Sequence, residues 1–170
     1  MKRQFARASL EAVTAPRWLE YEEGLAWVPI IRGCGYLTDE LHRRLRAGFG
    51  LTLAEFELLT VLSHAPDRRL RMSQVADNLF HSRSRVTHTT HRLEARGLIR
   101  REVFSDSRGR AVLAILTDDG FDLLDRAARA HVEHVRELLF DTADPADIRG
   151  AGRAFRAMLV AGGAPVPETW

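Results

Sequence analysis

Residues 70–99 read LRMSQVADNLFHSRSRVTHTTHRLEARGLI, and this stretch predicts two short helices joined by a tight turn. Ser73 can cap a first helix that carries Val75 on its apolar face, and Ser82 can cap a second helix. Gly97 follows the second helix, where a glycine commonly ends a helix. Because a turn of about three residues separates the two helices, the stretch is typical of a helix-turn-helix motif.

A β-hairpin and two further helices are predicted after this motif. Apolar residues within 98–103 precede a polar turn at 105–110, and the apolar run 111–116 follows it. Two such runs around a glycine-containing turn favour a hairpin. Thr117 can then cap a long amphipathic helix, and Asp144 followed by proline can begin a last helix.

Two helices are also predicted before the motif. Thr52 and Glu55 have the spacing of a capping box directly before an apolar set, which predicts a helix that ends near His64. From position 18 to position 45, apolar residues recur at three- and four-residue steps. This period predicts an earlier amphipathic helix with a kink near Pro29.

Length and composition indicate one ordinary globular domain. The chain has 170 residues, of which 45% are apolar and 28% charged, and these fractions are typical of soluble proteins. It has no run of about 18 uninterrupted apolar residues, and its first residues lack the apolar run of a signal peptide. Cys34 is the only cysteine and cannot form an intrachain disulfide, which fits a reducing compartment. We therefore expect a cytoplasmic protein that does not contact a membrane.

Positive charge is concentrated in one segment. Residues 68–110 contain eleven arginines and four acidic residues, a local charge of +7, although the whole chain carries only +2. The remainder therefore has 14 basic and 19 acidic side chains. A compact basic segment in an otherwise acidic chain indicates a surface that binds a polyanion. Arginine suits bidentate contacts with phosphate and guanine, although Lys2 is the only lysine of the chain, so an overall bias toward arginine explains the preference as well.

The predicted helix at 82–96 presents polar and basic side chains near its start, while Val86 and Leu93 face inward. A DNA major groove accepts one α-helix, whose first turns then meet base edges. We expect Arg83 to contact guanine, and Arg85 and Arg92 to contact phosphates or neighbouring acids. The candidate DNA-binding residues of this helix are Ser82, Arg83, Ser84, Arg85, Thr87, His88, His91 and Arg92. The competing interpretation is a basic helix that only faces solvent.

Four segments of the stretch 51–120 together carry a family resemblance. These segments are 70–76, 82–86, 92–99 and 106–110. Through them the chain resembles the MarR (multiple antibiotic resistance regulator) family. The resemblance implies a mainly α fold with a small β-hairpin wing, in a bacterial homodimer that represses transcription from pseudo-palindromic operators. It also implies that the helices within 18–47 and 118–160 intertwine as the dimerisation region.

The resemblance divides the chain into five regions. They are an N-terminal arm (1–16), an N-terminal dimerisation helix (17–50), a winged helix-turn-helix DNA-binding lobe (51–117), C-terminal dimerisation helices (118–160) and a mobile tail (161–170). The hairpin is then the wing, and we expect Arg108 or Arg110 to enter a minor groove. Asp106 is expected to hold one of these arginines in a fixed orientation. The competing interpretation is an ordinary charged hairpin turn.

Control by a small molecule is a further expectation from the resemblance, since repressors of this kind usually release DNA when an effector binds. The candidate effector pocket comprises Trp18, Trp27, Tyr36, Phe49 and Phe56. Aromatic residues at helical spacing usually belong to a core, so each of them also has a structural explanation. The sequence predicts no cofactor and does not identify the effector.

Two other sensing modes are open alternatives. Cys34 suggests a redox-responsive regulator, although a buried and inert cysteine fits its surroundings better. His131 and His134 lie three residues apart on one predicted helix face and suggest a metal-responsive regulator. Solvated helix histidines are the simpler interpretation of this pair. No metal site is therefore predicted.

Enzymatic and purely protein-binding functions are disfavoured. The sequence contains no Walker loop, no complete dinucleotide-binding glycine motif, no Gly-x-Ser-x-Gly and no His-Glu-x-x-His. A winged helix that binds only proteins is expected to present an acidic or apolar face, whereas the predicted face is basic. We therefore expect a DNA-binding regulator and not an enzyme.

Overall fold

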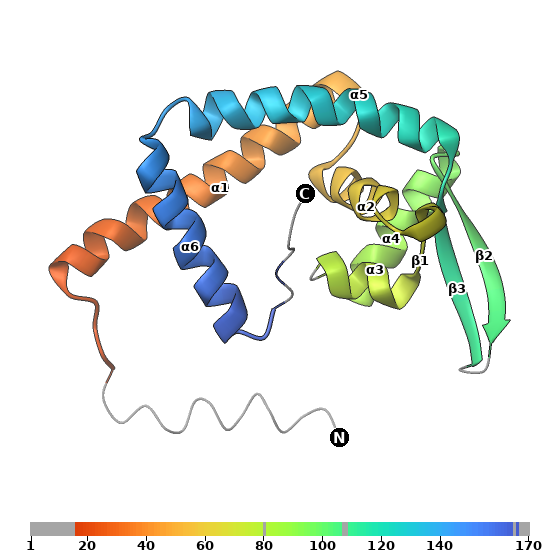
Figure 1. Ribbon diagram of the computed structural model, residues 1–170, viewed down its shortest axis with the longest axis horizontal. Coiled ribbons are helices and arrows are strands. Elements are labelled where there is room, and N and C mark those ends of the chain that lie inside the picture. The colour runs from red at the N-terminus through yellow and green to blue at the C-terminus, as the bar shows by residue number, and fades with distance from the viewer. Residues whose placement is uncertain (1–15, 80, 107–108, 165, 167–170) are drawn as a thin grey trace. The chain divides into compact units, whose positions relative to one another are not determined.

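The computed structural model describes residues 16–79, 81–106, 109–164 and 166. The chain divides into two compact units, Met1–Tyr36 and Leu37–Trp170. In chain order the elements are α1 (Tyr21–Phe49), α2 (Leu53–Ser63), the 3₁₀ turn η1 (Pro66–Arg68), β1 (Arg69–Arg71), α3 (Met72–Leu79), α4 (Arg83–Ala95), β2 (Ile99–Asp106), β3 (Gly109–Leu116), α5 (Asp118–Val135), the π-helical turn η2 (Arg136–Phe140) and α6 (Pro145–Ala161), as Figure 1 shows. The mainly α fold with a small β-hairpin is confirmed.

The first unit contains the first half of α1, and the second unit contains the rest of the chain. Helix α1 runs through Pro29 as one element and is not divided there. None of the described helices is long and apolar enough to cross a membrane.

Helix α2 forms the centre of the second unit. Its side chains Leu58, Leu59 and Leu62 are fully buried, in one cluster with residues of α3, α4 and α5. The predicted capping box is present: the Thr52 hydroxyl accepts from the Glu55 amide at 3.2 Å, and the Glu55 carboxylate accepts from the Thr52 amide at 2.8 Å. A helix that is apolar on nearly every face is expected to lie inside a core, and α2 does.

The helix-turn-helix prediction is confirmed for α4 and corrected for α3. Ser82 caps α4, since its hydroxyl accepts from the Arg85 amide at 3.2 Å. Helix α3 begins at Met72, so Ser73 lies inside its first turn and is not its cap. The side-chain oxygen of Gln74, in the first turn of the helix, accepts from the amide of the preceding Arg71 at 3.1 Å. The helix begins earlier than predicted because β1 continues to Arg71 and α3 follows it directly.

The sheet contains the predicted hairpin and one strand that the sequence did not predict. Strands β2 and β3 pair antiparallel from Ile99 with Leu116 at one end to Asp106 with Gly109 at the tip. Strand β1 pairs with the other edge of β3, with Leu70 opposite Ala114, so the order is β1-β3-β2. A strand of three residues is too short to show an alternating pattern.

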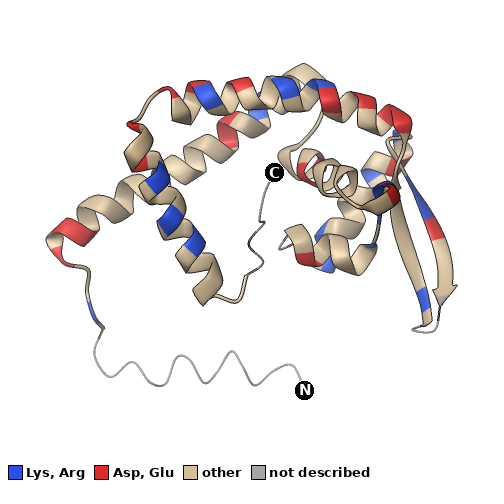
Figure 2. Ribbon diagram, in the orientation of Figure 1, with Lys and Arg blue, Asp and Glu red and all other residues tan. Residues whose placement is uncertain are grey.

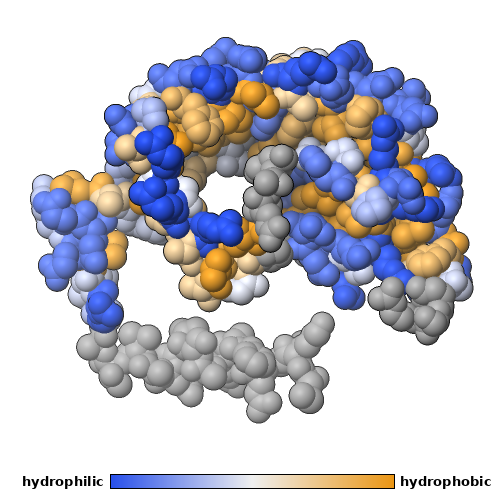
Figure 3. Space-filling model, in the orientation of Figure 1, coloured by the Kyte–Doolittle hydropathy of each residue, from blue (hydrophilic) through white to orange (hydrophobic). Residues whose placement is uncertain are grey.

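The C-terminal helices follow the predicted boundaries. Thr117 caps α5, and Asp144 caps α6 through a hydrogen bond from the Ala146 amide of 2.6 Å, with Pro145 in the first helical position. Helix α6 contains no buried residue in the single chain. Figure 3 shows hydrophobic surface near the end of this helix.

Candidate nucleic-acid interface

Helix α4 separates its residues cleanly into a buried and an exposed face. Val86, Thr89, Thr90 and Leu93 are buried, and the Thr90 hydroxyl donates to the Val86 carbonyl at 2.7 Å. The exposed residues of the helix and its cap include every candidate DNA-binding position, namely Ser82, Arg83, Ser84, Arg85, Thr87, His88, His91 and Arg92. Every candidate DNA-binding residue of this helix is therefore exposed to solvent.

A groove of about 540 Å³ lies beside this exposed face. Its described lining residues are Arg71, Met72, Ser73, Arg83, Thr87, Arg101, Arg110, Ala111 and Val112. Four of them are arginines, contributed by β1, α4, β2 and β3, and none is acidic. We call these four arginines the arginine groove. Four guanidinium groups around a groove whose described lining has no acidic residue favour an anionic ligand.

The sequence had singled out only Arg83 and Arg110 of the arginine groove. Arg71 and Arg101 join it through the sheet, and the ring of Phe104 lies 5.0 Å from the Arg71 guanidinium carbon. The density of arginines around position 70 was a signal for Arg71, but the strand that carries it was not predicted. Without β1, the sequence offered no reason to place Arg71 beside α4.

Many arginines of the basic segment are paired with acids. The described pairs are Arg68 with Asp118, Arg69 with Asp67, Arg92 and Arg96 with Glu55, Arg100 with Glu102 and Arg101 with Glu94. Among the described residues, Arg83, Arg85 and Arg110 take part in no ion pair. Figure 2 shows acidic and basic residues alternating around the lobe. The local charge of +7 thus overstates the positive charge that is available to bind an anionic ligand.

Glu55 anchors α4 to the start of α2. Its carboxylate is almost fully buried and accepts from Arg92 Nε at 2.9 Å, while Arg96 Nη1 lies 3.9 Å from its other oxygen. Arg96 also donates to the Gly50 carbonyl at 3.0 Å. Burial alone raises the pKa of Glu55, but the hydrogen bonds from Thr52 and Arg92 outweigh it and lower the pKa. Arg92 therefore meets a neighbouring acid, one of its two predicted roles.

A second network ties the end of α4 to the wing. The Arg101 guanidinium donates to Glu94 at 2.8 Å, and the Arg101 amide donates to the same carboxylate at 3.2 Å. The hydrogen bond from Arg101 lowers the pKa of Glu94. The ring nitrogens of His91 lie 3.3 and 3.4 Å from the guanidinium of Arg101. The wing is thereby held in a fixed position relative to α4.

The wing tip is described in part. Arg110 is exposed on β3 opposite Ser105, and Gly109 has a φ of +103°, a conformation that favours glycine at the turn. Arg108 lies outside the described residues, and so does the side chain of Asp106. The expected contact between Asp106 and an arginine therefore stays a prediction.

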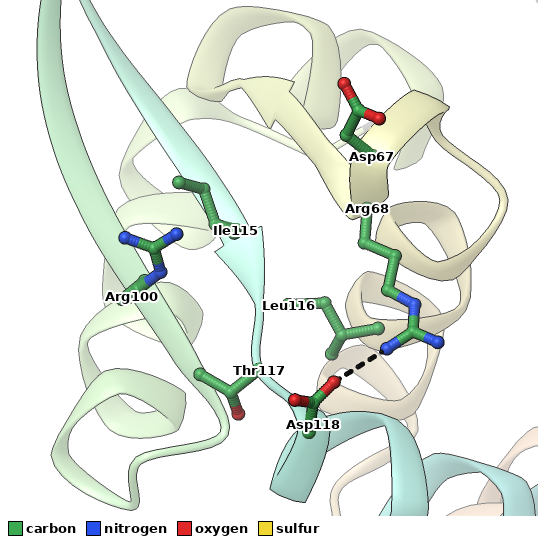
Figure 4. A pocket seen from close by; sticks show the side chains of 7 residues that line it. All are labelled: Asp67, Arg68, Arg100, Ile115, Leu116, Thr117 and Asp118. Atoms are coloured by element: carbon green, nitrogen blue, oxygen red, sulfur yellow. Dashed lines mark hydrogen bonds and ion pairs between the residues drawn. The ribbon is translucent and has the colours of Figure 1, made fainter.

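At the opposite end of the sheet, a cavity of about 620 Å³ lies between the hairpin base and the turn before β1 (Figure 4). Arg68 extends from that turn to Asp118 at the start of α5, with 3.1 Å between Nη1 and Oδ1. The Arg68 guanidinium also lies 3.8 Å from the centre of the Phe121 ring. Two acids and two arginines line this cavity, so its charge is balanced and its contacts hold α5 to the lobe.

The candidate effector residues fall into different environments. Trp18, Trp27 and Tyr36 are exposed in the first unit. Phe49 is half-buried against the core of the second unit, and Phe56 is a buried member of that core. The structure thus gives Phe56 the structural role that the sequence left open beside ligand binding.

Two expectations about sensing residues are corrected. Cys34 is exposed and not buried. His131 and His134 are half-buried and not solvated, and the ring of His131 lies 4.6 Å from that of Phe56. Burial lowers the pKa of His131, and His134 adds to this shift. Among the described residues, no three metal-binding side chains are grouped so that they could hold an ion.

A sequence profile of the MarR family matches residues 49–111. The crystal structure of Sco3205, a MarR family transcriptional regulator from Streptomyces coelicolor in complex with DNA, is similar with a TM-score of 0.80 and 38% identity, over 92% of this chain and 96% of that chain. The chain belongs to the MarR family. AbsC, a second MarR family transcriptional regulator from S. coelicolor, is similar with a TM-score of 0.79 and 33% identity, over 86% and 97% of the two chains.

The MarR family match extends from the end of α1 to the start of β3 and so includes most of the residues around the arginine groove. PecS, an HTH-type transcriptional regulator of Dickeya dadantii, is 33% identical over 105 residues, which are 61% of this chain and 62% of PecS. The match therefore spans less than two thirds of PecS. These relatives are transcriptional regulators and not enzymes.

Proposed function

We propose that this chain is a transcriptional regulator that binds double-stranded DNA with α4 in the major groove and the wing in the adjacent minor groove. The observation that carries the proposal is the arginine groove, which lies beside the exposed face of α4 and has no acidic residue in its described lining. A duplex presents both phosphates and base edges to such a surface. The similarity to Sco3205, which was crystallised with DNA, supports it.

Individual roles follow from the contacts of each side chain. Arg83 carries no ion pair and lies in the first turn of α4, where a guanidinium reaches guanine. Thr87 donates its hydroxyl proton to the Arg83 carbonyl at 2.8 Å, so it accepts from a base and does not donate. Arg110 and Arg85 are exposed, and we assign Arg110 to the minor groove and Arg85 to phosphates. Arg92 donates a hydrogen bond to Glu55 and so holds α4 in position against α2.

An Arg83→Ala variant should lose about 1 to 3 kcal/mol of binding free energy at one base pair and relax the preference there. Fluorescence anisotropy with DNA from upstream of the protein's own gene, and with scrambled DNA, measures this loss. Arg126→Ala is the matched control, because Arg126 is an exposed arginine of α5 that donates a long hydrogen bond of 3.4 Å to the Asp122 carbonyl of its own helix. We expect the control to bind both DNAs like the wild type.

Arg110→Ala serves as a contrast in the same titrations, repeated over a salt series. If Arg110 neutralises one phosphate, its loss should reduce the slope of log K against log salt by about 0.9. An equal loss of affinity by Arg83→Ala on every sequence would make Arg83 a phosphate contact. Weak and equal binding of the wild type to both DNAs would contradict sequence-specific regulation.

The regulator is further proposed to act as a homodimer on a pseudo-palindromic operator, with half-sites about 34 to 36 Å apart. Large apolar side chains are exposed on the helices outside the lobe. In α5, η2 and α6 they include Val132, Phe140, Phe155, Met158 and Val160, and in the first unit Leu25, Trp27, Val28, Ile30 and Ile31. Apolar surface of this extent marks a protein interface. A second copy of the chain covers both groups of exposed apolar side chains, because a two-fold dimer buries the same surfaces on each partner.

A Phe155→Asp, Met158→Asp double variant should therefore sediment as a monomer, whereas the wild type sediments at twice the chain mass of 19.2 kDa. Two carboxylates placed in an apolar interface cost several kcal/mol of association free energy. Val103→Asp is the control, since Val103 is equally exposed but lies on the wing. A monomeric wild type at micromolar concentration would refute the dimer.

Regulation by a small molecule that releases DNA is part of the same proposal, and repression in the bacterial cytoplasm is its expected outcome. The exposed aromatic rings of Trp18, Trp27 and Tyr36 offer apolar surface to such a ligand. A compound that quenches tryptophan fluorescence and also displaces the DNA would support it. The exposure of Cys34 favours redox control as the second candidate, which predicts that peroxide releases the DNA and that Cys34→Ser abolishes this release.

A further inference from the structure

A cavity of about 470 Å³ lies against a different face of α4 from the arginine groove. It is bounded by the C-terminal half of α1, the start of α2, the residue before the α4 cap and α4 itself. Its lining residues are Thr38, Asp39, His42, Thr52, Leu53, Ala54, Glu57, His81, Arg85, His88, Thr89 and Arg92. Seven of these twelve side chains ionise.

Glu57 and His81 are the half-buried ionisable groups of this cavity. Burial raises the pKa of Glu57, and nearby Arg85 offsets part of this shift. Burial lowers the pKa of His81, and Arg85 lowers it further. Burial therefore disfavours the charged form of each group, and the positive charge of Arg85 acts on both of them.

The other ionisable groups around Glu57 and His81 come from every neighbouring element. Helix α1 contributes Asp39 and His42, and His42 Nδ1 accepts from the Leu53 amide at 3.4 Å. Helix α4 contributes Arg85 and His88, which are exposed, and Arg92, which is paired with Glu55. The cavity thus connects the two half-buried groups to the face of α4 that we assign to DNA phosphates.

We propose that this cavity is a proton-binding site that couples DNA binding to proton uptake, so that the protein binds DNA more tightly as the pH falls from about 8 to about 6. The inference rests on the proposed function, because the phosphates beside Arg85 and His88 supply the negative potential. That potential favours the protonated form of a carboxyl and of an imidazole alike. Proton uptake in the complex requires, by linkage, an affinity that rises with proton concentration.

The test is a series of anisotropy titrations between about pH 6 and about pH 8 at constant ionic strength. A change of one pKa unit on binding corresponds to a tenfold change in affinity, so we expect about a tenfold tightening for the wild type. Glu57→Gln keeps the shape but cannot ionise, and should raise the affinity at the alkaline end. His81→Gln stays neutral and should lower the affinity at the acid end only. The double variant should lose most of this tightening.

His64→Gln is the matched control, because His64 is an exposed histidine at the opposite end of α2 from the cavity. It should keep the slope of the wild type. The NMR titration of His81 in the free protein and in the complex gives an independent readout, and DNA should raise the pKa that it reports. Circular dichroism at both ends of the range verifies that every variant is folded.

A wild-type affinity that is constant across the range would overturn the inference, and so would a double variant that keeps the full slope. Loss of the slope in His64→Gln would also overturn it, since the linked proton would then lie elsewhere. If the wild type binds no DNA at any pH, the proposed function itself is wrong. These outcomes separate failure of the inference from failure of the function.

Discussion

A Gly120→Ala variant is expected to lose about 3 kcal/mol of unfolding free energy, at the upper end of what overpacking costs. Gly120 lies in the first turn of α5, and a Cβ added there would lie 2.0 Å from the Leu98 carbonyl oxygen and 2.8 Å from a methyl carbon of Leu116. The carbonyl cannot retreat freely, because it accepts from the Thr117 amide at 3.2 Å. The end of α4, the wing and α5 meet at this point.

Urea denaturation followed by circular dichroism measures the loss. Alanine normally stabilises a helix relative to glycine by up to about 1 kcal/mol, so a large loss has the opposite sign to the propensity effect. Gly48→Ala is the control, since nothing lies within 4 Å of its added Cβ, and it should be neutral or slightly stabilising. Equal stability of Gly120→Ala and the wild type would show that α5 does not approach Leu98 this closely.

A Glu55→Ala variant is expected to lose about 2 to 3 kcal/mol at neutral pH. About 1 kcal/mol comes from the capping box with Thr52, and the rest from the buried carboxylate that holds Arg92. The loss stays below the cost of breaking a fully buried pair, because the side chain of Arg92 is 53% exposed and can turn to water. DNA affinity should fall as well, since α4 loses its anchor to α2.

The loss should depend on pH in a defined direction. The pKa of Glu55 in the folded protein is lowered from the usual 4.5, so the ionised carboxylate stabilises the fold above that pH. This contribution is lost as the pH falls from 4.5 to below the lowered pKa of folded Glu55. At such acid pH the wild type and the variant should have similar unfolding free energies. Glu102→Ala removes an exposed pair with Arg100 and should cost less than about 0.5 kcal/mol. Equal losses in the two variants would contradict the anchoring role.

The correct sequence predictions are those that depend on neighbours within a few residues. Caps at Thr52, Ser82, Thr117 and Asp144 are formed by hydrogen bonds to amides two or three residues away. Such bonds need no tertiary contact, so residue order is sufficient to locate them. The exposed face of α4 follows for the same reason, because the helical period decides which positions share a face.

The missed features depend on residues far apart in the chain. Strand β1 exists because Leu70 pairs with Ala114, and Arg71 joins the arginine groove through that pairing. Nothing in the sequence indicated that Glu55 accepts a hydrogen bond from Arg92, since 37 positions separate the two residues. Its prediction that Cys34 is buried failed for a related reason, because burial depends on what packs against a helix and not on the helix itself.

The amino-acid sequence by itself determined the order of the helices and the hairpin, the residues exposed on α4 and the resemblance to the MarR family, because periodicity and capping are local properties. The tertiary structure alone decided which arginines are free to bind DNA. Charge adds along a chain regardless of distance, whereas an ion pair forms only where folding brings an acid within about 4 Å. The count of +7 therefore indicated the candidate interface, and the packing of α2, α4 and the sheet left Arg83, Arg85 and Arg110 without an acidic partner within it.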